Sequence, residues 1–361
     1  MIPGMHYERD NIREMAGYAP GEQPSATEVI KLNTNENPWP PSPAAMAVLN
    51  DISPEALRRY PSPTAAAFLD EAARLHGVDK ECLVATNGGD ELLRLAMTTF
   101  VPPGEPIGIA DPSYSLYPVL AAIHESPIKA VELLEDYDLP EDFAAQMNAA
   151  GVKLTLLVNP HAPSGRLFDV DRIDALAQAL DGVLLVDEAY VDFAPASHNV
   201  IPLIARHDNL MILRTLSKGY SLAGLRLGYG IGSPNLIRPI AEKTRDSYSV
   251  DALADAIGAA ALADQTTAKA SWQAVREERA RITEALTERG FAVAPSHSNF
   301  CLARMPAAAR HSAQATYEKL KARNILVRYF PAQRLNDCLR ISIGTPAQND
   351  ALLCALDEIL A

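Results

Sequence analysis

The side chains most able to do chemistry in this sequence follow short apolar runs. One such run ends in Arg-Thr-Leu-Ser-Lys, which places Lys218 beside hydroxyl groups and ahead of Arg226. Two other runs end in Asn159 and in Asp187, and Tyr190 comes three residues after that aspartate. A lysine in a loop is usually a surface residue. At the end of a buried strand, however, its amine could act as a nucleophile.

Four short segments of continuous apolar character are predicted to be strands buried on both faces, because a strand with one wet face alternates apolar and polar residues. These segments are residues 106–112, 153–160, 182–190 and 209–215. Longer stretches with helical spacing lie between them, such as residues 90–100 and 170–180. This alternation predicts an α/β fold with a doubly wound, mainly parallel sheet.

The character of the sequence changes after about residue 250. A long alanine-rich helical pattern covers residues 253–290, and strand-like runs follow at 299–305, 325–330 and 338–344. Helices are predicted before the second of these runs and at the C-terminus, which indicates a smaller α/β domain. We therefore divide the chain into three parts. They are an N-terminal arm that also contributes to the small domain (1–43), a large domain (44–250) and a small C-terminal domain (251–361).

Ligands of open α/β sheets bind at the carboxyl ends of the strands, where these polar residues occur. Pyridoxal phosphate needs a lysine amine for a Schiff base, a carboxylate beside its pyridine nitrogen and donors at its phenolic oxygen. Lys218 and Asp187 suit the first two needs. Asn159 and Tyr190 suit the third. A suitable polar side chain at one predicted strand end is weak evidence. Suitable side chains at several strand ends together indicate this cofactor.

A cradle for the cofactor phosphate is predicted from a separate turn. In "ATNGGDELLRL", Gly88 and Gly89 precede a helical pattern, and backbone N–H groups at a helix N-terminus favour anions. Ser217 and Arg226 add a hydroxyl and a positive charge. Each residue alone has a simpler explanation, such as a turn, a helix cap or a surface ion pair. Their joint occurrence favours the cofactor.

The chain resembles the fold-type I pyridoxal-phosphate enzymes, in the aminotransferase branch that contains histidinol-phosphate aminotransferase. The resemblance covers nearly the whole chain and rests on "YAPG", "KLNTNENPWPPSP", "RRYPSPT", "NGGDELL", "DPSYSLYP", "NPHAPSG", "LVDEAYVDF", "RTLSKGYSLAGLRLGY", "SNF", "VRYF" and "LRISIGT". It implies a seven-stranded sheet in the large domain and a homodimer. "NPHAPSG" and "SKGYSLAG" depart from the commoner family patterns, although Asn159 is kept.

The resemblance implies a role for each matching position. Lys218 becomes the Schiff-base lysine, Asp187 the catalytic partner of the pyridine nitrogen, and Tyr190, with Asn159, a donor to the phenolic oxygen. The other implied cofactor-binding residues are Gly88, Gly89, Asp90, Tyr114 stacked on the ring, Thr215, Ser217, Arg226 and Tyr60, which reaches the cofactor phosphate of the neighbouring subunit. The implied substrate-binding residues are Tyr18, Asn35, Arg328 and Arg340.

Arg340 is expected to hold a substrate anion, because a guanidinium group pairs with two oxygens at once. By resemblance, Arg328 and Tyr18 help it with the phosphate of L-histidinol phosphate. The predicted reaction passes the amino group of that donor to 2-oxoglutarate, in histidine biosynthesis, with Lys218 moving the proton. An aromatic amino-acid aminotransferase and a threonine-phosphate decarboxylase remain alternatives on the same scaffold. A nicotinamide dehydrogenase would need a Gly-x-Gly-x-x-Gly turn, which "NGGDEL" does not supply.

The composition is that of an ordinary globular protein with small-molecule partners. The chain has 361 residues and a formal net charge of −13, which argues against binding to nucleic acid or to an anionic membrane. No segment suits a signal peptide or a bilayer span. The four cysteines lack Cys-x-x-Cys spacing, so we expect core thiols in a reducing cytoplasm and no metal site.

Overall fold

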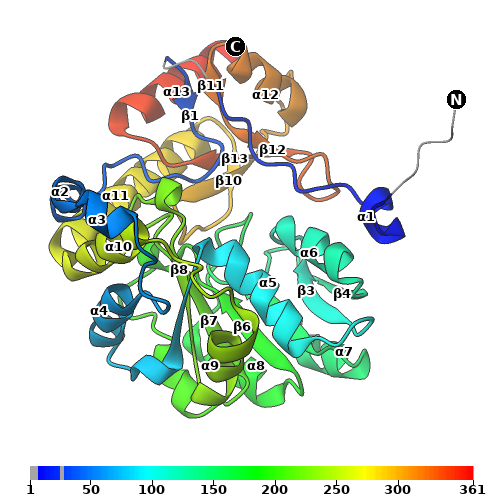
Figure 1. Cartoon of the computed structure of the whole chain (residues 1–361). Helices are drawn as coiled ribbons and strands as arrows, with labels where there is room; N and C mark the ends of the chain where they lie inside the picture. The colour runs from blue at the N-terminus through cyan, green and yellow to red at the C-terminus, as the bar shows by residue number, and fades with distance from the viewer. Residues whose placement is uncertain (1–6, 25–27, 361) are drawn as a thin grey trace, which may run out of the picture.

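The computed structural model describes residues 7–24 and 28–360, and its two larger sheets lie in separate halves of the molecule (Figure 1). The seven-stranded sheet has the order β2-β8-β7-β6-β5-β3-β4. Its strands are β2 (Leu83–Thr86), β3 (Ile107–Asp111), β4 (Ile128–Glu132), β5 (Leu154–Val158), β6 (Val183–Asp187), β7 (Leu210–Thr215) and β8 (Gly228–Gly232). β8 is antiparallel to both of its neighbours, and the pairs from β7 to β4 are parallel. The predicted fold class is confirmed.

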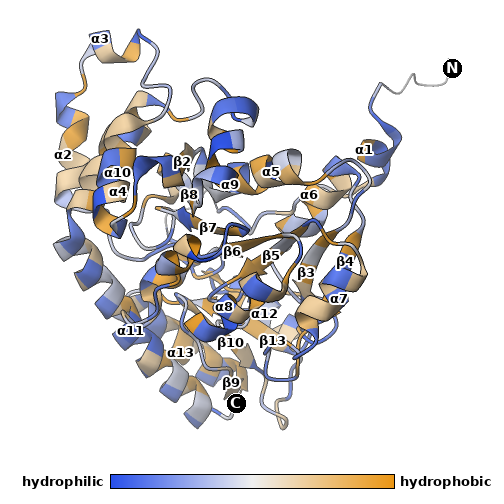
Figure 2. Ribbon diagram, turned by 90° about the horizontal axis from the view of Figure 1, so that it is seen from below, coloured by the Kyte–Doolittle hydropathy of each residue, from blue (hydrophilic) through white to orange (hydrophobic). Residues whose placement is uncertain are grey.

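Helices cover both faces of this sheet, which explains why its strands are continuously apolar. In β7, Met211 and Leu213 pack on one side, whereas Leu210 and Ile212 pack on the other. The helices on the first side are α5 (Gly88–Phe100), α6 (Leu116–His124) and α9 (Pro234–Pro239). Those on the second side are α4 (Ala66–His76), α7 (Phe143–Ala149), α8 (Val170–Ala179) and α10 (Ala252–Ala263). Figure 2 shows hydrophobic strands between these helices.

Strands β2, β4 and β8 were not among the four runs predicted from apolar character. β8 is rich in glycine, which weakens a strand. The glycines are required here because α5 lies very close. A Cβ atom on Gly228 would come within 2.8 Å of the Gly88 carbonyl carbon, and one on Gly230 within 3.0 Å of Leu92.

The second half of the molecule contains a four-stranded antiparallel sheet of order β12-β13-β10-β9. Its strands are β9 (Ala292–Val293), β10 (Phe300–Arg304), β12 (Arg328–Tyr329) and β13 (Cys338–Ser342), and its helices are α11 (Gln265–Glu288), α12 (Ala313–Lys321) and α13 (Pro346–Leu360). The predicted strand at 325–330 is divided, because β11 (Ile325–Leu326) pairs instead with β1 (Ile30–Lys31).

The β1–β11 pair joins residues of the predicted N-terminal arm to the C-terminal half of the chain. Helix α1 (Asp10–Glu14) lies in the predicted arm, whereas α2 (Pro43–Asp51) begins at its last residue and α3 (Pro54–Leu57) follows it in the chain. Residues 1–6 and 25–27 of the predicted arm lie outside the described residues. The boundary at residue 250 stays a prediction, although α10 packs on α4 and so covers the large sheet.

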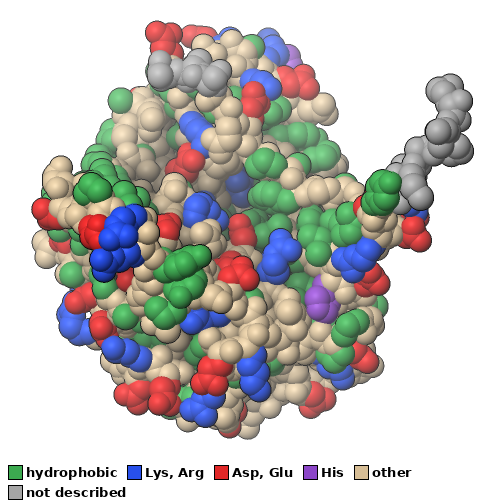
Figure 3. Space-filling model, in the orientation of Figure 1, with side chains coloured by type: hydrophobic (Ala, Val, Ile, Leu, Met, Phe, Trp, Pro, Cys, Tyr) green, Lys and Arg blue, Asp and Glu red, His purple; other side chains and the backbone are tan. Residues whose placement is uncertain are grey.

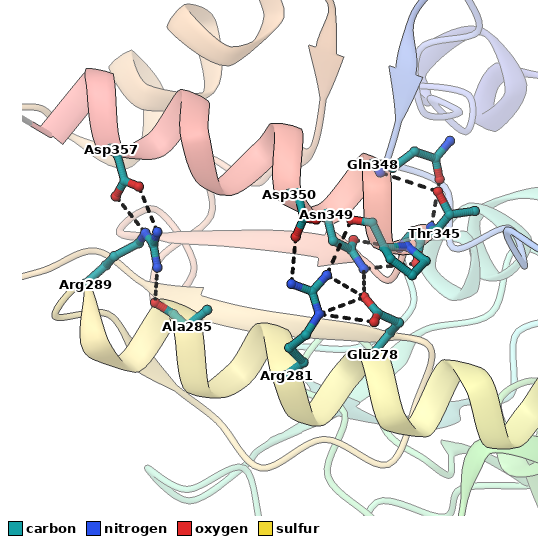
Figure 4. A network of polar contacts seen from close by, with 11 residues as sticks. Glu278, Arg281, Ala285, Arg289, Thr345, Gln348, Asn349, Asp350 and Asp357 are labelled. Atoms are coloured by element: carbon teal, nitrogen blue, oxygen red, sulfur yellow. Dashed lines mark hydrogen bonds and ion pairs between the residues drawn. The ribbon is translucent and has the colours of Figure 1, made fainter.

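A polar network fastens α13 to α11 and supports the strand between them (Figure 4). Arg281 pairs with Glu278 at 2.8 Å and with Asp350 at 2.7 Å. The buried amide of Asn349 donates to Glu278 and also bonds both backbone groups of Gly344, just after β13. These contacts hold the end of β13, the strand that carries Arg340, in a defined place.

The cysteine prediction is correct only in part. Cys301 and Cys338 are buried, as expected of core thiols, and Cys82 is partly buried. Cys354 is exposed because it lies on the solvent side of α13. In the part of the chain that the structure describes, no helix combines the length and the apolar character that a bilayer span needs.

Candidate active site

A cavity of about 420 Å³ lies between the large sheet and the smaller half of the molecule. In the space-filling view, a hollow with basic and acidic side chains around it occupies this region (Figure 3). Its walls include the carboxyl ends of β3, β6 and β7, the first turn of α5 and part of the N-terminal arm. The predicted site residues that line it are Tyr18, Asn35, Gly89, Asp90, Tyr114, Asp187, Tyr190, Thr215, Ser217, Lys218, Arg226, Arg328 and Arg340.

Lys218 lies three residues beyond β7 and presents its amine to the cavity. Its Nζ donates a hydrogen bond of 2.9 Å to the backbone carbonyl of Thr34, in the N-terminal arm. Burial first, and then the charge of Arg340, lower the pKa of Lys218 to about 8. A fraction of the amine is therefore neutral near neutral pH, which a nucleophile or a general base requires.

Asp187 ends β6 and is buried. Its Oδ2 accepts a hydrogen bond of 3.0 Å from the hydroxyl of Tyr117, and its Oδ1 accepts one of 3.1 Å from the Ala189 N–H. Burial raises the pKa of Asp187 to about 6, while these two hydrogen bonds oppose the rise. Tyr117 was missed by the sequence prediction. The signal that could have indicated it is its spacing of three residues from Tyr114, which lies just before α6.

Asn35 connects the smaller half of the molecule to Tyr190. Its side-chain nitrogen donates to the Tyr190 hydroxyl at 3.1 Å. Asn35 has a φ of 55°, a conformation that non-glycine residues seldom adopt. Ser342 bonds both its backbone N–H and its side-chain oxygen, and Asn299 donates to its carbonyl. The two strands β10 and β13 thus hold the residue that orients Tyr190 in the cavity.

The first turn of α5 and the segment after β7 form a cradle with the properties expected for a phosphate. Gly88 has a φ of 75°, and a Cβ atom there would lie 2.6 Å from Arg226, so glycine is needed for the guanidinium to approach. Arg226 lies 3.4 Å from the Ser217 hydroxyl and 3.5 Å from Asp90. Thr215 donates to Ser217 at 3.0 Å. The free N–H groups at the start of α5 add to these donors.

A second basic group lies at the other end of the cavity. Arg328 and Arg340 are paired across β12 and β13, so both side chains project from the same face. Each guanidinium lies over the ring of Phe330, at 5.3 Å and 5.4 Å from its centroid. Arg340 also donates to the Asn33 carbonyl at 2.9 Å. Among the described residues, no atom accepts from the buried Nε of Arg340, which therefore suits an anionic ligand.

Three predicted residues do not line this cavity. Gly88 lies directly behind it, against Arg226. The amide of Asn159 is fully buried and exchanges two hydrogen bonds of 2.9 Å with the backbone of Phe168. Tyr60 is 81% exposed and stacks on Tyr248 with a centroid separation of 4.5 Å. The roles predicted for Asn159 and Tyr60 stay predictions.

Comparison with known proteins assigns the chain to a family. The family described as aminotransferase class I and II matches residues 27–356. The chain is 43% identical to histidinol-phosphate aminotransferase 1 of Trichormus variabilis and 41% identical to a histidinol-phosphate aminotransferase of Geobacter sp., over 98% and 97% of this chain and 99% and 98% of those proteins.

A crystal structure gives the same result. The histidinol-phosphate aminotransferase of Sinorhizobium meliloti, solved in complex with pyridoxal-5'-phosphate, superposes with a TM-score of 0.90. It is 26% identical to this chain, and the match covers 100% of this chain and 99% of that one. Sequence and structure agree over the full length, so this chain belongs to the aminotransferase class I and II family.

Proposed function

We propose that this chain is a pyridoxal-phosphate-dependent aminotransferase that converts L-histidinol phosphate and 2-oxoglutarate into imidazole acetol phosphate and L-glutamate. One observation carries the proposal: a single cavity holds a buried lysine amine, a buried carboxylate and two adjacent arginines. The relatives named histidinol-phosphate aminotransferase support the amino donor. The Sinorhizobium meliloti complex supports the cofactor.

The residues at the strand ends fit pyridoxal phosphate. When bound, the cofactor supplies an electron-accepting ring that stabilises negative charge on the substrate carbon. Lys218 would hold its aldehyde through Nζ. Asp187 would hold the proton on the pyridine nitrogen, because above a pKa of about 6 it presents a buried negative charge to that nitrogen.

The other predicted cofactor residues would fix the ring and its phosphate. Tyr190 would donate to the phenolic oxygen. The side-chain nitrogen of Asn159 lies 2.9 Å from the Phe168 carbonyl and 3.4 Å from His198 Nε2, so its donation to the cofactor would replace one of these contacts. The ring of Tyr114 forms part of the cavity wall and would cover one face of the cofactor. The residues proposed for the phosphate are Gly88, Gly89, Asp90, Thr215, Ser217 and Arg226.

The chemical step requires Lys218 to move a proton. With the substrate bound, the Nζ of Lys218 would remove the proton from the substrate Cα. A pKa of about 8 leaves part of the amine neutral at neutral pH, so that it can accept this proton. Lys218 would thus act first as general base and then as general acid, and hydrolysis must release the keto product before the first half-reaction is complete.

The substrate would be held by the basic group at the opposite end of the cavity. Arg340 and Arg328 present two guanidinium groups to one place, which suits a dianionic phosphate. Tyr18 lines the same cavity and contacts Tyr114 edge-on. Asn35 also lines this cavity and donates to the Tyr190 hydroxyl. In the second half-reaction, the same arginines would bind the distal carboxylate of 2-oxoglutarate.

We extend the proposal to a homodimer in the cytoplasm whose other partners are small molecules. Tyr60 is largely exposed and does not line the cavity of its own subunit. Its exposed ring would reach the cofactor phosphate of a neighbouring subunit. Tyr60→Phe should therefore weaken cofactor binding only in the dimer, which a measurement of cofactor release and sedimentation would test.

The amino donor is tested with the purified, cofactor-loaded protein in the absence of any keto acid. L-Histidinol phosphate, L-phenylalanine and threonine phosphate are added to separate samples, and the visible absorbance of the bound cofactor is followed. We expect rapid bleaching with histidinol phosphate at far lower concentration than with phenylalanine. Preference for phenylalanine would indicate an aromatic aminotransferase. Release of carbon dioxide from threonine phosphate would indicate a decarboxylase.

The lysine assignment is tested with Lys218→Ala. This variant should lose the absorbance of the covalently held cofactor and nearly all turnover. Lys153→Ala is a matched control, because it removes the same charge from a half-exposed lysine 3.8 Å from Glu105. A Lys218→Ala protein that retained both the absorbance and the activity would contradict the assignment.

A further inference from the structure

The loop between β12 and β13 forms the wall of the cavity on the side of the smaller sheet. We call residues 330–337 the roof loop. Phe330, Ala332 and Leu335 of this loop line the cavity, and Leu335 is buried. The loop begins and ends in the small antiparallel sheet, whereas Lys218 and Asp187 follow strands of the large sheet. A contact must therefore cross between the two halves if the roof loop is to stay in place.

Arg334 makes that contact. Its two terminal nitrogens donate to the backbone carbonyls of Leu133 and Leu134, each at 2.6 Å. Its Nη1 also lies 3.3 Å from the carboxylate of Glu132, the last residue of β4. Hydrogen bonds from a charged donor are shorter and stronger than neutral ones. One side chain of the roof loop thus binds two consecutive carbonyls and a carboxylate of the large domain.

The ring of Tyr137 completes the receiving surface. The guanidinium of Arg334 lies 5.3 Å from the centroid of this ring, a favourable cation–π distance. On its other side, Tyr137 faces the ring of His161, with 6.2 Å between centroids and 29° between planes. His161 in turn bonds the carbonyl of Pro112, which lines the cavity, at 2.8 Å.

The turn that receives Arg334 is itself rigidly connected to the large sheet. The N–H of Leu133 donates to the carbonyl of Asp111 at 2.9 Å, and Asp111 also lines the cavity. Arg166 forms ion pairs with two other residues of the turn, with Asp136 at 2.9 Å and with Asp138. Because the turn is held by its own contacts, the roof loop can move away from the large domain only if the Arg334 contacts break.

We propose that Arg334 is a positioning residue that fastens the roof loop to the large domain and thereby sets the affinity of the site for its amino donor. The proposal rests on the proposed function. Phe330 lies under the guanidinium groups of Arg328 and Arg340, so a displaced roof loop would displace the residues that bind the substrate anion. Lys218 and Asp187 would keep their places. A loosened loop should therefore raise KM and leave the attachment of the cofactor unchanged.

The test compares three variants of the cofactor-loaded enzyme. Arg334→Ala removes every contact to the turn, and Arg334→Lys keeps the charge but not the fork of two donors. Both retain a Cβ atom, so the strain of a backbone φ of 71° is the same in each. Arg304→Ala is the matched control, because Arg304 pairs at 2.6 Å with Asp337, at the other end of the roof loop, within the small sheet.

Two measurements are made on each variant: hydrogen exchange of residues 330–337, and the kinetics of transamination with L-histidinol phosphate. In Arg334→Ala we expect both the exchange of the roof loop and KM to rise by at least about tenfold, since the loss of even one charged hydrogen bond corresponds to about that factor and two are lost. Arg334→Lys should fall between this variant and the wild type. Arg304→Ala should resemble the wild type, and the visible absorbance of the cofactor should be the same in all of them.

Unchanged exchange of the roof loop in Arg334→Ala would overturn the proposal. Equal effects of Arg304→Ala and Arg334→Ala would also overturn it, because the small sheet alone would then hold the loop. A loss of kcat at constant KM would contradict the predicted separation of substrate binding from chemistry. The exchange measurement needs no substrate. Faster exchange in Arg334→Ala would thus support the role of Arg334 in holding the roof loop, even if the wild type showed no transamination. The absence of transamination would refute only the proposed function.

Discussion

The hydroxyl of Tyr117 should control the charge of Asp187, and Tyr117→Phe tests this directly. The hydroxyl donates to Asp187 at 3.0 Å, and the Ala189 N–H is the only other hydrogen-bond donor that the described residues bring to this carboxylate. Phenylalanine keeps the ring, which packs edge-on against Tyr114 with 5.5 Å between centroids. The substitution therefore removes one hydrogen bond and little else.

The size of the effect follows from that bond. A hydrogen bond to a charged group contributes about 1.5–3 kcal/mol, which corresponds to about 1–2 pKa units. Its loss should raise the pKa of Asp187 from about 6 toward about 7–8. Because the folded pKa lies above the unfolded one, the cofactor-free protein loses stability as the pH rises, until the pH exceeds the folded pKa. The variant should continue to lose stability between about pH 6 and about pH 7–8, a range in which the wild type no longer does.

The assay is urea unfolding of both cofactor-free proteins at about pH 6 and about pH 8.5. The difference between their free energies of unfolding should grow by about 1–2 kcal/mol over this interval. Tyr229→Phe is the control, because the buried Tyr229 hydroxyl bonds His76 at 2.7 Å. Burial lowers the pKa of His76 to about 3, so this pair does not change charge between the two measurements. If Tyr117→Phe lowered the free energy of unfolding by the same amount at both pH values, the reasoning would be refuted.

Three further outcomes are expected. The cofactor-free protein should capture pyridoxal phosphate faster as the pH rises through about 8, because the pKa of Lys218 is lowered to about 8; stopped-flow rates that are flat between pH 7 and 9 would contradict this. Gly258→Ala should lower the melting temperature, with a cost of about 1–3 kcal/mol, because the new Cβ would lie 2.2 Å from Leu227. Arg214→Met should cost about 3–5 kcal/mol, since it leaves the fully buried Glu188 without its 2.6 Å partner, and adding Glu188→Gln should recover part of that loss in urea unfolding.

The central strands of the large sheet were predictable because continuous apolar segments of the sequence indicate strands that are buried on both faces. β5, β6 and β7 are apolar at most of the positions that pack on either layer of helices. Their carboxyl ends meet at one edge of the sheet by the geometry of parallel strands, so the positions of Asp187 and Lys218 along the chain are enough to place them together. This reasoning needs no knowledge of distant contacts.

The other strands and several site residues were not predictable in this way. β8 has a glycine at every second position, and its strand conformation depends on the neighbours β2 and β7 and on close contact with α5. Tyr117 has the apolar environment of an ordinary core residue, and only the folded chain brings its hydroxyl to Asp187. Nothing in the sequence distinguishes Arg334 from the other arginines of exposed loops.

The sequence by itself thus determined the fold class and the candidate residues for the chemical step, because apolar periodicity and residue type are local properties of the chain. The tertiary structure alone decided how these residues are tuned and held. The pKa values of Asp187 and Lys218 depend on burial and on neighbouring charges, and these come from segments far away in the sequence. In the same way, Asn35 is held from strands β10 and β13, and Arg334 spans two halves of the molecule. Such contacts arise only when the sheets have packed together.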